Sequence, residues 1–427
     1  MKKKSELLDK LIGHDVILWG ARMTGLGALR TLRKHGIEPV CFVDSDPSFC
    51  DIKSGGLSVY APQNLNQAIS KNKWNPKLLV TVALKEQEII NQLSDYNIRD
   101  LEYFSFQDKD APYFTVDVLS SCNLACLSCP HSIPNHNVPG GSMRFGTFTQ
   151  VIDKIVEESP DTSHISLYSW GEPLLHPKIA QMVDCIHEKG LAVALSSNLS
   201  FSFDSRLEQL VKSEPDYLKI SLSGYYEKAY NSTHQGGNID LVKSNLYRLR
   251  YYIDKYNANI LVDINYHLYR NNNGLNLKMF RSLASELGFM LSSTYALVMP
   301  LERVINHVEG KTDFQTSMLQ ENLLVTIDEG IKASSHNTKP TKTCPFRENQ
   351  VNINADLTVP VCCTVFNRKG NVVSDDFLKS SLAEISKQKE NVEICKKCEN
   401  YQLPSYNLGL NQQEWRRYAR KKETLDN

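Results

Sequence analysis

Apolar positions in the first part of the chain fall into short continuous runs separated by helical stripes. The runs Asp15–Trp19 and Pro39–Val43 are typical of buried strands, and the stripe between them predicts a helix that ends near Lys34. A further buried run begins at Leu78. Because strands that alternate with helices favour a parallel sheet, residues 1–108 are predicted to form a separate α/β unit.

The same alternation then repeats five or six times over residues 109–320. Consecutive βα units imply a parallel sheet with right-handed crossovers, here a partial (β/α)6 barrel, whose chemistry is expected at the carboxyl ends of its strands. The predicted strands are Tyr113–Leu119, His164–Ser169, Leu191–Leu195, Tyr217–Gly224, Ile260–Asn265 and a last one near Tyr295–Met299, and the predicted helices include Pro177–Glu188, Ser205–Val211, Ile239–Asn257 and Leu277–Leu287.

Beyond residue 310 the apolar period weakens, and residues 311–343 are interpreted as a polar connector. Residues 340–405 are predicted to form a small cysteine-rich unit. In it, Gln350–Asn354 and Leu357–Val361 flank a short polar turn, which predicts a β-hairpin. Residues 406–427 are interpreted as a charged helical tail.

Charge and composition limit the partners that the chain could have. Its 427 residues carry 48 Lys and Arg against 48 Asp and Glu, so neither a nucleic acid nor a membrane is an expected partner. No stretch approaches the roughly 20 apolar residues of a membrane span, and Glu6, Asp9 and Lys10 interrupt any signal-peptide core. Eleven cysteines without an export signal favour a cytoplasmic protein whose thiols bind metals.

Three cysteines follow the first predicted barrel strand. Cys122, Cys126 and Cys129 have the spacing C-x3-C-x2-C. Thiolates on one short loop can hold three irons of a four-iron cluster and leave the fourth iron open for chemistry. A zinc loop that recruits His131, or three ordinary buried thiols, are the alternatives, although the three-residue first gap fits zinc poorly.

This spacing after a strand resembles the motif of the radical S-adenosylmethionine (SAM) enzyme superfamily. Gly171-Glu172-Pro173, one βα unit later, resembles the segment with which that superfamily grips the methionine amino group, and a carboxylate suits an ammonium partner. Ser223 stands where the family frequently has an acid, and Ser128 where many members have an aromatic residue on the adenine. The resemblance implies SAM contacts at Gly171, Glu172, Ser197, Asn198, Ser221 and Ser223.

A second cysteine set lies in the C-terminal unit. Its spacing resembles the one-cluster (twitch) form of the SPASM/twitch extensions of radical SAM enzymes, which implies a second [4Fe–4S] cluster; a structural zinc is the alternative. Because successive strand residues face opposite sides, Cys362 and Cys363 should not both face one cluster, and Cys363 is expected not to be a ligand. The implied ligands are Cys344, Cys362, Cys395 and Cys398.

The first unit has the order strand, glycine turn, helix, strand, acid, which is that of a Rossmann unit. Its glycines, in the segment Gly20–Gly27, have the spacing G-x4-G-x-G instead of G-x-G-x-x-G. The unit resembles small Rossmann-like domains at the front of enzymes that handle nucleotide-linked sugars, which implies a nucleotide site with Asp44 or Asp46 on a ribose hydroxyl. A degenerate domain that packs or recruits partners is the alternative.

The resemblances together imply a radical SAM oxidoreductase or isomerase. Such an enzyme reductively cleaves SAM to a 5′-deoxyadenosyl radical, with an electron from a flavodoxin- or ferredoxin-type donor. The radical would abstract hydrogen from a small sugar-like or nucleotide-linked substrate, giving oxidation (dehydrogenation) or epimerisation, the latter if Cys363 is a free hydrogen donor. The alternative is a maturase that modifies a peptide or protein. Candidate substrate or catalytic residues are Cys363, Tyr168 and His267, together with Asn265 and Arg270.

Overall fold

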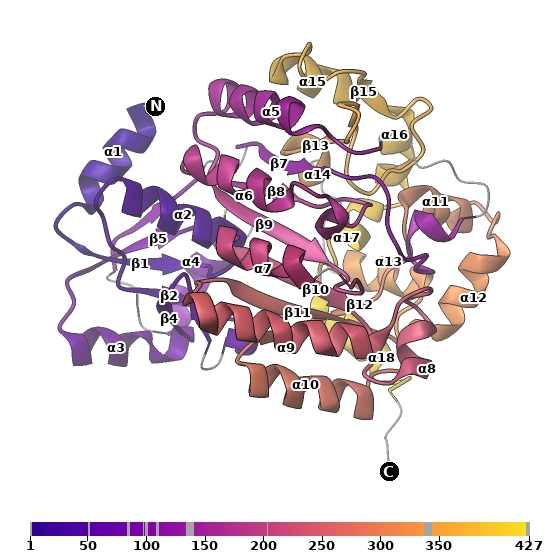
Figure 1. The fold of residues 1–427 in the computed structure, drawn as a ribbon, viewed down its shortest axis with the longest axis horizontal. Coiled ribbons are helices and arrows are strands. Elements are labelled where there is room, and N and C mark those ends of the chain that lie inside the picture. Colours follow the sequence, from indigo (N-terminus) through magenta and orange to yellow (C-terminus); the bar gives the residue numbers. More distant parts are fainter. Residues whose placement is uncertain are drawn as a thin grey trace.

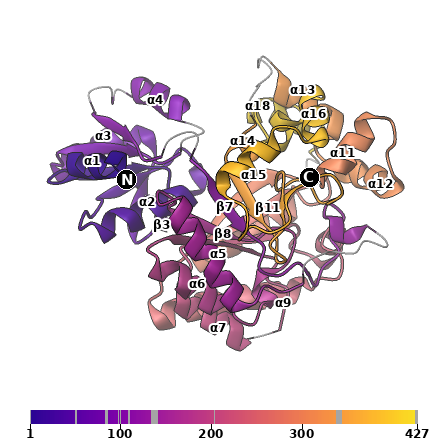
Figure 2. The same cartoon turned by 90° about the horizontal axis from the view of Figure 1, so that it is seen from above.

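The computed structural model describes residues 2–49, 52–82, 86–96, 98, 101–107, 111–133, 141–202, 204–336 and 344–423. The predicted boundaries at residues 108–109 and 340, and the end of the tail, lie outside these residues. Two mainly parallel sheets organise the chain, with the N-terminal unit on one side of the larger sheet and the C-terminal helices on another (Figures 1 and 2). None of the described helices is long and apolar enough to cross a membrane.

The N-terminal sheet has the strand order β3-β4-β2-β1-β5-β6. Its strands run parallel except β3, which is antiparallel to β4. The continuous apolar run predicted for the first strand becomes the buried centre of the sheet, which is Rossmann-like as expected. The strands are β1 (Asp15–Trp19), β2 (Cys41–Val43), β3 (Lys53–Ser54), β4 (Leu57–Tyr60), β5 (Pro76–Val80) and β6 (Tyr103–Ser105), and the helices are α1 (Lys2–Leu11), α2 (Met23–Lys34), α3 (Leu65–Asn72) and α4 (Glu86–Asp95).

The larger sheet is all parallel in the order β12-β11-β10-β9-β8-β7-β13. Its six consecutive strands form the predicted partial barrel, and helices cover its outer face (Figure 1). The strands are β7 (Tyr113–Val116), β8 (His164–Leu167), β9 (Ala192–Ser197), β10 (Tyr217–Leu222), β11 (Leu261–Leu268) and β12 (Met290–Tyr295), and the helices are α5 (Phe145–Glu158), α6 (Ile179–Glu188), α7 (Asp204–Ser213), α8 (Glu227–Asn231), α9 (Ile239–Tyr256) and α10 (Leu275–Leu287).

The last barrel strand was predicted five residues too late. The strand is Met290–Tyr295, and the apolar run that follows it is a loop leading to Pro300. A proline cannot donate a backbone hydrogen bond, and the residue before it is restricted to extended conformations. The loop residue Val298 is nevertheless fully buried, because it packs against the C-terminal helices.

The predicted hairpin does not form. Instead β13 (Gln350–Ile353) adds to the barrel sheet in parallel beside β7, while β14 (Val359–Pro360) pairs antiparallel with β15 (Val372–Ser374). The partial barrel leaves one edge of β7 open, and an open strand edge is a template for pairing. The apolar side chains of Val351 and Ile353 are buried in the barrel core there, so burial outweighs the local turn signal.

The connector and the tail are both folded. Helix α11 (Leu301–Val308) precedes the residues interpreted as a connector, and these contain α12 (Phe314–Asn322) and α13 (Ile327–Ser335), the last begun by a capping box between Thr326 and Glu329. In the tail, the Trp415 side chain is buried and its Nε1 donates to the Ser334 hydroxyl at 3.0 Å. The other C-terminal helices are α14 (Pro345–Glu348), α15 (Leu382–Lys389), α16 (Glu393–Asn400), α17 (Leu403–Asn407) and α18 (Gln412–Ala419).

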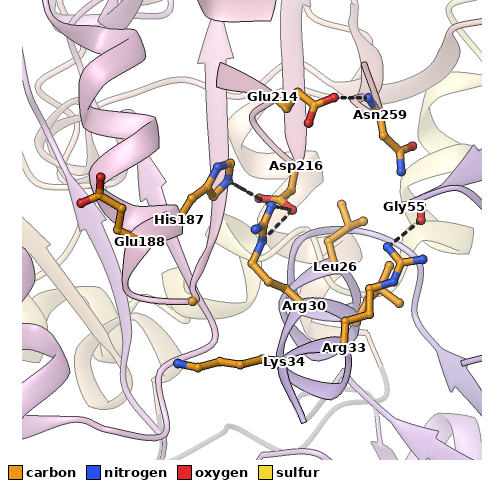
Figure 3. Close-up of a pocket in the computed structure, with 12 residues that line it drawn as sticks. Leu26, Arg30, Arg33, Lys34, Gly55, His187, Glu188, Glu214, Asp216 and Asn259 are labelled. Carbon is orange, nitrogen blue, oxygen red and sulfur yellow. Dashed lines mark hydrogen bonds and ion pairs between the residues drawn. The ribbon is translucent and has the colours of Figure 1, made fainter. Parts of the chain in front are cut away.

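Helix α2 joins the N-terminal unit to the barrel by direct contact with β8 and β9. A Cβ atom on Gly27 would lie 2.9 Å from Ser163, so this glycine allows the close approach. Beside it, Arg30 donates to Asp216, whose other oxygen lies 2.9 Å from His187 Nε2 (Figure 3). These contacts fix the N-terminal unit against the amino-terminal ends of the barrel strands.

Candidate radical SAM site

The cysteine loop leaves the end of β7 and is held by the backbone of other segments. Ala125 N donates to Gln235 O at 2.9 Å and Leu127 N to Thr233 O at 3.2 Å. The carbonyl of Leu127 also accepts a 2.7 Å bond from the buried Arg303 on α11, a contact that the sequence did not indicate. The loop is therefore positioned from both the barrel and the C-terminal helices.

The three thiols of this loop lie close enough to influence one another. Burial raises the pKa of Cys122 to about 11 and that of Cys129 to about 12. The pKa of Cys126 is raised by burial and then by the neighbouring charges of Cys129 and Cys122. Three adjacent thiolates are stable in such a site only with cations beside them, so this donor set fits an iron–sulfur cluster.

Among the described residues, no group of three or more His, Cys, Asp or Glu side chains is gathered for one metal ion. The thiolates of a four-iron cluster each bind a different iron, so they need not converge on one point.

Gly171 brings the second motif directly onto the cysteine loop. A Cβ atom there would lie 1.5 Å from the carbonyl oxygen of Leu119, so only glycine fits. Next to it, Glu172 N donates to Ser121 O at 3.0 Å. The Gly-Glu-Pro turn and the cysteine loop therefore form one tightly packed unit at the strand ends.

Asp117 supports this unit and was missed in the sequence. It is buried at the end of β7, and burial raises its pKa to about 7, although the backbone N–H groups of Gly171 and Leu119 oppose the shift. The only available signal was an acid at the end of an apolar run.

The carboxylate of Glu172 connects two strand ends. Its oxygens accept bonds from Leu174 N at 3.1 Å and from Asn198 N at 2.7 Å, and burial raises its pKa to about 7. The Asn198 side chain in turn donates to Asn123 at 3.0 Å and lies 3.6 Å from the sulfur of Cys122. Ser197 is beside them, where its hydroxyl accepts from the backbone of Leu199. Of the predicted SAM residues, Glu172, Ser197 and Asn198 thus share one network with the cysteine loop, and Ser221 and Ser223 lie outside it.

A cavity of about 260 Å³ opens at this network. A larger cavity, of about 510 Å³, lies at the junction of Figure 3 and contains none of the predicted site residues. Ser223 and Cys363 do not line the smaller cavity; Ser223 is fully buried, with its hydroxyl 2.8 Å from His234 Nδ1. The predicted residues that do line it are Cys122, Cys126, Cys129, Tyr168, Gly171, Glu172, Ser197, Asn198, Ser221 and His267.

Two candidate substrate residues face the cavity from the barrel strands. Burial, followed by the nearby charge of Lys219, lowers the pKa of His267 to about 4, so this imidazole is neutral at pH 7. The Tyr168 hydroxyl donates to the sulfur of Met23 at 3.4 Å. A third candidate, Arg270, is exposed and donates to Leu323 O at 3.0 Å instead of facing the cavity.

The second cysteine set also comes together. Cys395 and Cys398 are three residues apart on α16 and so share a face. Burial, followed by the neighbouring charges of Cys344, Cys362 and Cys395, raises the pKa of Cys398. The structure thus brings the four predicted ligands together in one region.

Cys362 and Cys363 lie in a turn after β14, not on a strand, so the argument from strand alternation was wrong in its premise. Cys363 instead has Gln350, on β13, as a hydrogen-bonding neighbour.

In the N-terminal unit, the acids predicted to bind ribose form bonds within the protein around the glycine turn. The Asp44 carboxylate accepts bonds from Ala21 N at 3.0 Å and Asp46 N at 2.9 Å. Arg22 pairs with Asp46 and lies 4.0 Å from the barrel residue Asp263. The acids expected to bind ribose are thus engaged with their own loop.

Comparison with known proteins gives a family match to the middle of the chain. Residues 116–267 match the model described as Radical SAM superfamily. The tungsten-containing aldehyde ferredoxin oxidoreductase cofactor-modifying protein of Pyrococcus furiosus is 28% identical over 111 residues, which are 26% of this chain and 30% of that protein. The chain thus aligns with less than a third of that relative.

Solved structures resemble the chain at lower identity. Native anSMEcpe with bound AdoMet is 15% identical, with a TM-score of 0.45, over 73% of this chain and 97% of that one. SuiB of Streptococcus suis bound to S-adenosylmethionine is 14% identical, with a TM-score of 0.44, over 65% of this chain and 64% of that one. Residues 116–267 thus match the radical SAM superfamily, the family that the spacing of the loop cysteines resembles.

Proposed function

We propose that the chain abstracts a hydrogen atom from a small substrate held inside the barrel. When bound, the cluster and SAM supply the 5′-deoxyadenosyl radical for this step. The observation that carries the proposal is the shared cavity, because the three loop cysteines, Glu172 and Asn198 line it together with the inward-facing Tyr168 and His267.

Two parts of this chain, the loop cysteines and Glu172, would prepare the site. Cys122, Cys126 and Cys129 would hold the cluster. Glu172 already accepts two backbone bonds, but a carboxylate has about four lone-pair positions, so it can also accept from the ammonium of SAM. Its raised pKa of about 7 is due to burial, and an ammonium partner would favour the charged form.

A small substrate is supported over a peptide by the closed base of the barrel. Met23 of the N-terminal unit contacts Tyr168 there. We expected a sugar-like or nucleotide-linked substrate; because Asp44 is engaged by its own loop, the nucleotide link is less well supported, and a packing role for the N-terminal unit is favoured.

We further propose that Cys344, Cys362, Cys395 and Cys398 hold a second [4Fe–4S] cluster. A flavodoxin- or ferredoxin-type protein would be the electron donor. Oxidation and epimerisation both fit this arrangement. Cys363 has Gln350 and Tyr113, the first residues of β13 and β7, as neighbours and does not line the cavity, so epimerisation with Cys363 as hydrogen donor is less well supported than oxidation.

Anaerobic reconstitution tests the proposed function. With dithionite and SAM, the protein should release 5′-deoxyadenosine slowly even without substrate and contain about eight irons. A variant with Cys122, Cys126 and Cys129 all changed to Ala should lose about four irons and all SAM cleavage. Cys185→Ala, in the core of α6, is the matched control and should keep both. Unchanged iron content in the triple variant would contradict the proposal.

A further inference from the structure

Lys219 lies on the inner face of the barrel, below the predicted SAM residues. Along β10, Leu218, Ile220 and Leu222 pack into the outer core, so the alternate residues Lys219 and Ser221 face inward. Ser221 lines the cavity, and Lys219 precedes it by two residues, roughly 6–7 Å further from the carboxyl end of the strand.

The ammonium group of Lys219 is close to residues that line the cavity. Its Nζ lies 4.9 Å from the centroid of the Tyr168 ring. Its charge also contributes to the lowered pKa of His267. Tyr168 and His267 both line the cavity and Lys219 does not, so the positive charge lies just beyond the cavity, next to these two residues.

No carboxylate in the described part of the chain forms an ion pair with Lys219. Asp263 is opposite it on β11, but the oxygens of Asp263 accept bonds from Tyr217 at 2.6 Å and Ser292 at 2.7 Å. Arg22 also lies 4.0 Å from Asp263. A lysine that is half-buried in a protein interior normally has a counter-charge, because desolvating an unpaired charge is costly.

We propose that Lys219 binds an anionic group of the substrate, a carboxylate or a phosphate, at the base of the cavity. The side chain of Asn265, on the same inner face, lies 3.1 Å from His267 and adds a polar group near this position. This inference rests on the proposed function, since it names the substrate class of that site. The carboxylate of SAM is the competing occupant.

The melting temperature of the reconstituted holoenzyme with SAM, measured with different anions, tests whether Lys219 binds an anion. A ligand that binds the folded state raises the melting temperature, by an amount that grows with the logarithm of its concentration relative to Kd. Inorganic phosphate and acetate, each replacing chloride at constant ionic strength, are the probes. At least one of the two anions should stabilise the wild-type protein. Stabilisation by phosphate would indicate a phosphate group on the substrate, and stabilisation by acetate a carboxylate. Lys219→Met should weaken that anion at least tenfold, and Lys219→Arg should restore it.

Lys278→Met, at an exposed position on α10, is the matched control and should respond like the wild-type protein. Equal responses of the wild-type protein and Lys219→Met to both anions would overturn the proposal. So would a tenfold weaker SAM affinity in Lys219→Met with the anion response intact, because Lys219 would then serve SAM. Failure of the wild-type protein to cleave SAM would instead contradict the proposed function.

Discussion

Gly171 shows how a single backbone position decides whether the two motifs can meet. The carbonyl of Leu119 occupies the space where a side chain would begin. The backbone of Glu172 then reaches Ser121, and its carboxylate reaches Asn198. The motif glycine therefore acts by allowing the cysteine loop and the Glu172 turn to pack directly.

Gly171→Ala should displace the cysteine loop. Forcing a methyl group against a backbone oxygen typically costs about 1–3 kcal/mol, and the loop should then hold its cluster poorly. Iron content and urea denaturation measure the two effects. Gly146→Ala, on α5 with no atom within 4 Å of the new Cβ, is the control and should be neutral or slightly stabilising. Equal iron and equal stability in the two variants would contradict the steric argument.

At the residue scale, the sequence predicted the groups that occur in spaced motifs. The loop cysteines and Glu172 were found because their spacing is specific. Asp117 and Lys219 were missed because each is a lone polar residue in an apolar segment, and Arg303 because it looks like an ordinary charged helix residue beside Glu302; their surroundings show only in three dimensions. The spacing of residues in the sequence does not reveal which distant residue forms a hydrogen bond or ion pair with a buried polar side chain.

At the element scale, all barrel strands but the last could be placed because their outward-facing apolar side chains are buried in the core beneath the helices. The position of β13 could not be predicted, because its partner β7 lies more than 200 residues earlier (Gln350 pairs with Tyr113). The short turn after β13 does form, with Leu357 N donating to Asn354 O at 2.8 Å, but no ladder follows it. A local turn signal therefore does not establish a hairpin when a distant strand edge is open.

The turn after β14 makes the roles of its two cysteines testable. Cys362→Ala should remove about four irons and destabilise the C-terminal unit, because metal binding and folding are coupled in such modules. Cys363→Ala should keep all the iron, since the thiol of Cys363 has Gln350, outside the proposed ligand set, as its hydrogen-bonding neighbour. Iron analysis of the two purified variants is the measurement. Iron loss in Cys363→Ala alone would reverse the assignment.

At the scale of the whole molecule, the N-terminal unit closes the base of the barrel. Met23 contacts Tyr168 and α2 packs on β8 and β9, so the glycine turn is part of the barrel floor. The sequence predicted the unit itself, because its strands and helices alternate regularly. Its placement was not predictable, since Gly27 and Arg30 look like ordinary helix residues until Ser163 and Asp216 lie opposite them.

The stability of the junction should depend more on Arg30 than on Arg33, one helical turn away. Arg30 makes two bonds to Asp216 Oδ1, of 3.1 and 2.9 Å, across the two units. Arg33 pairs with Glu38 within one unit, where both side chains are exposed. Arg30→Gln should therefore lower the free energy of unfolding by about 1–2 kcal/mol, near the lower end for a charged hydrogen bond because Arg30 is partly exposed. Arg33→Gln should cost about 0–1 kcal/mol.

The pH dependence of the Arg30→Gln stability deficit shows whether the deficit comes from the charge of Asp216. Burial alone would raise the pKa of Asp216, but the hydrogen bond from His187 and the charge of Arg30 outweigh it and lower the pKa. A lowered pKa in the folded state adds stability above the unfolded value of about 3.9, and this stability is lost as the pH falls through the folded value. Urea denaturation should therefore show the full Arg30→Gln deficit at pH 7 and a shrinking deficit below about pH 4. A deficit that stays constant to pH 3 would mean that Arg30 acts by packing and not through the charge of Asp216.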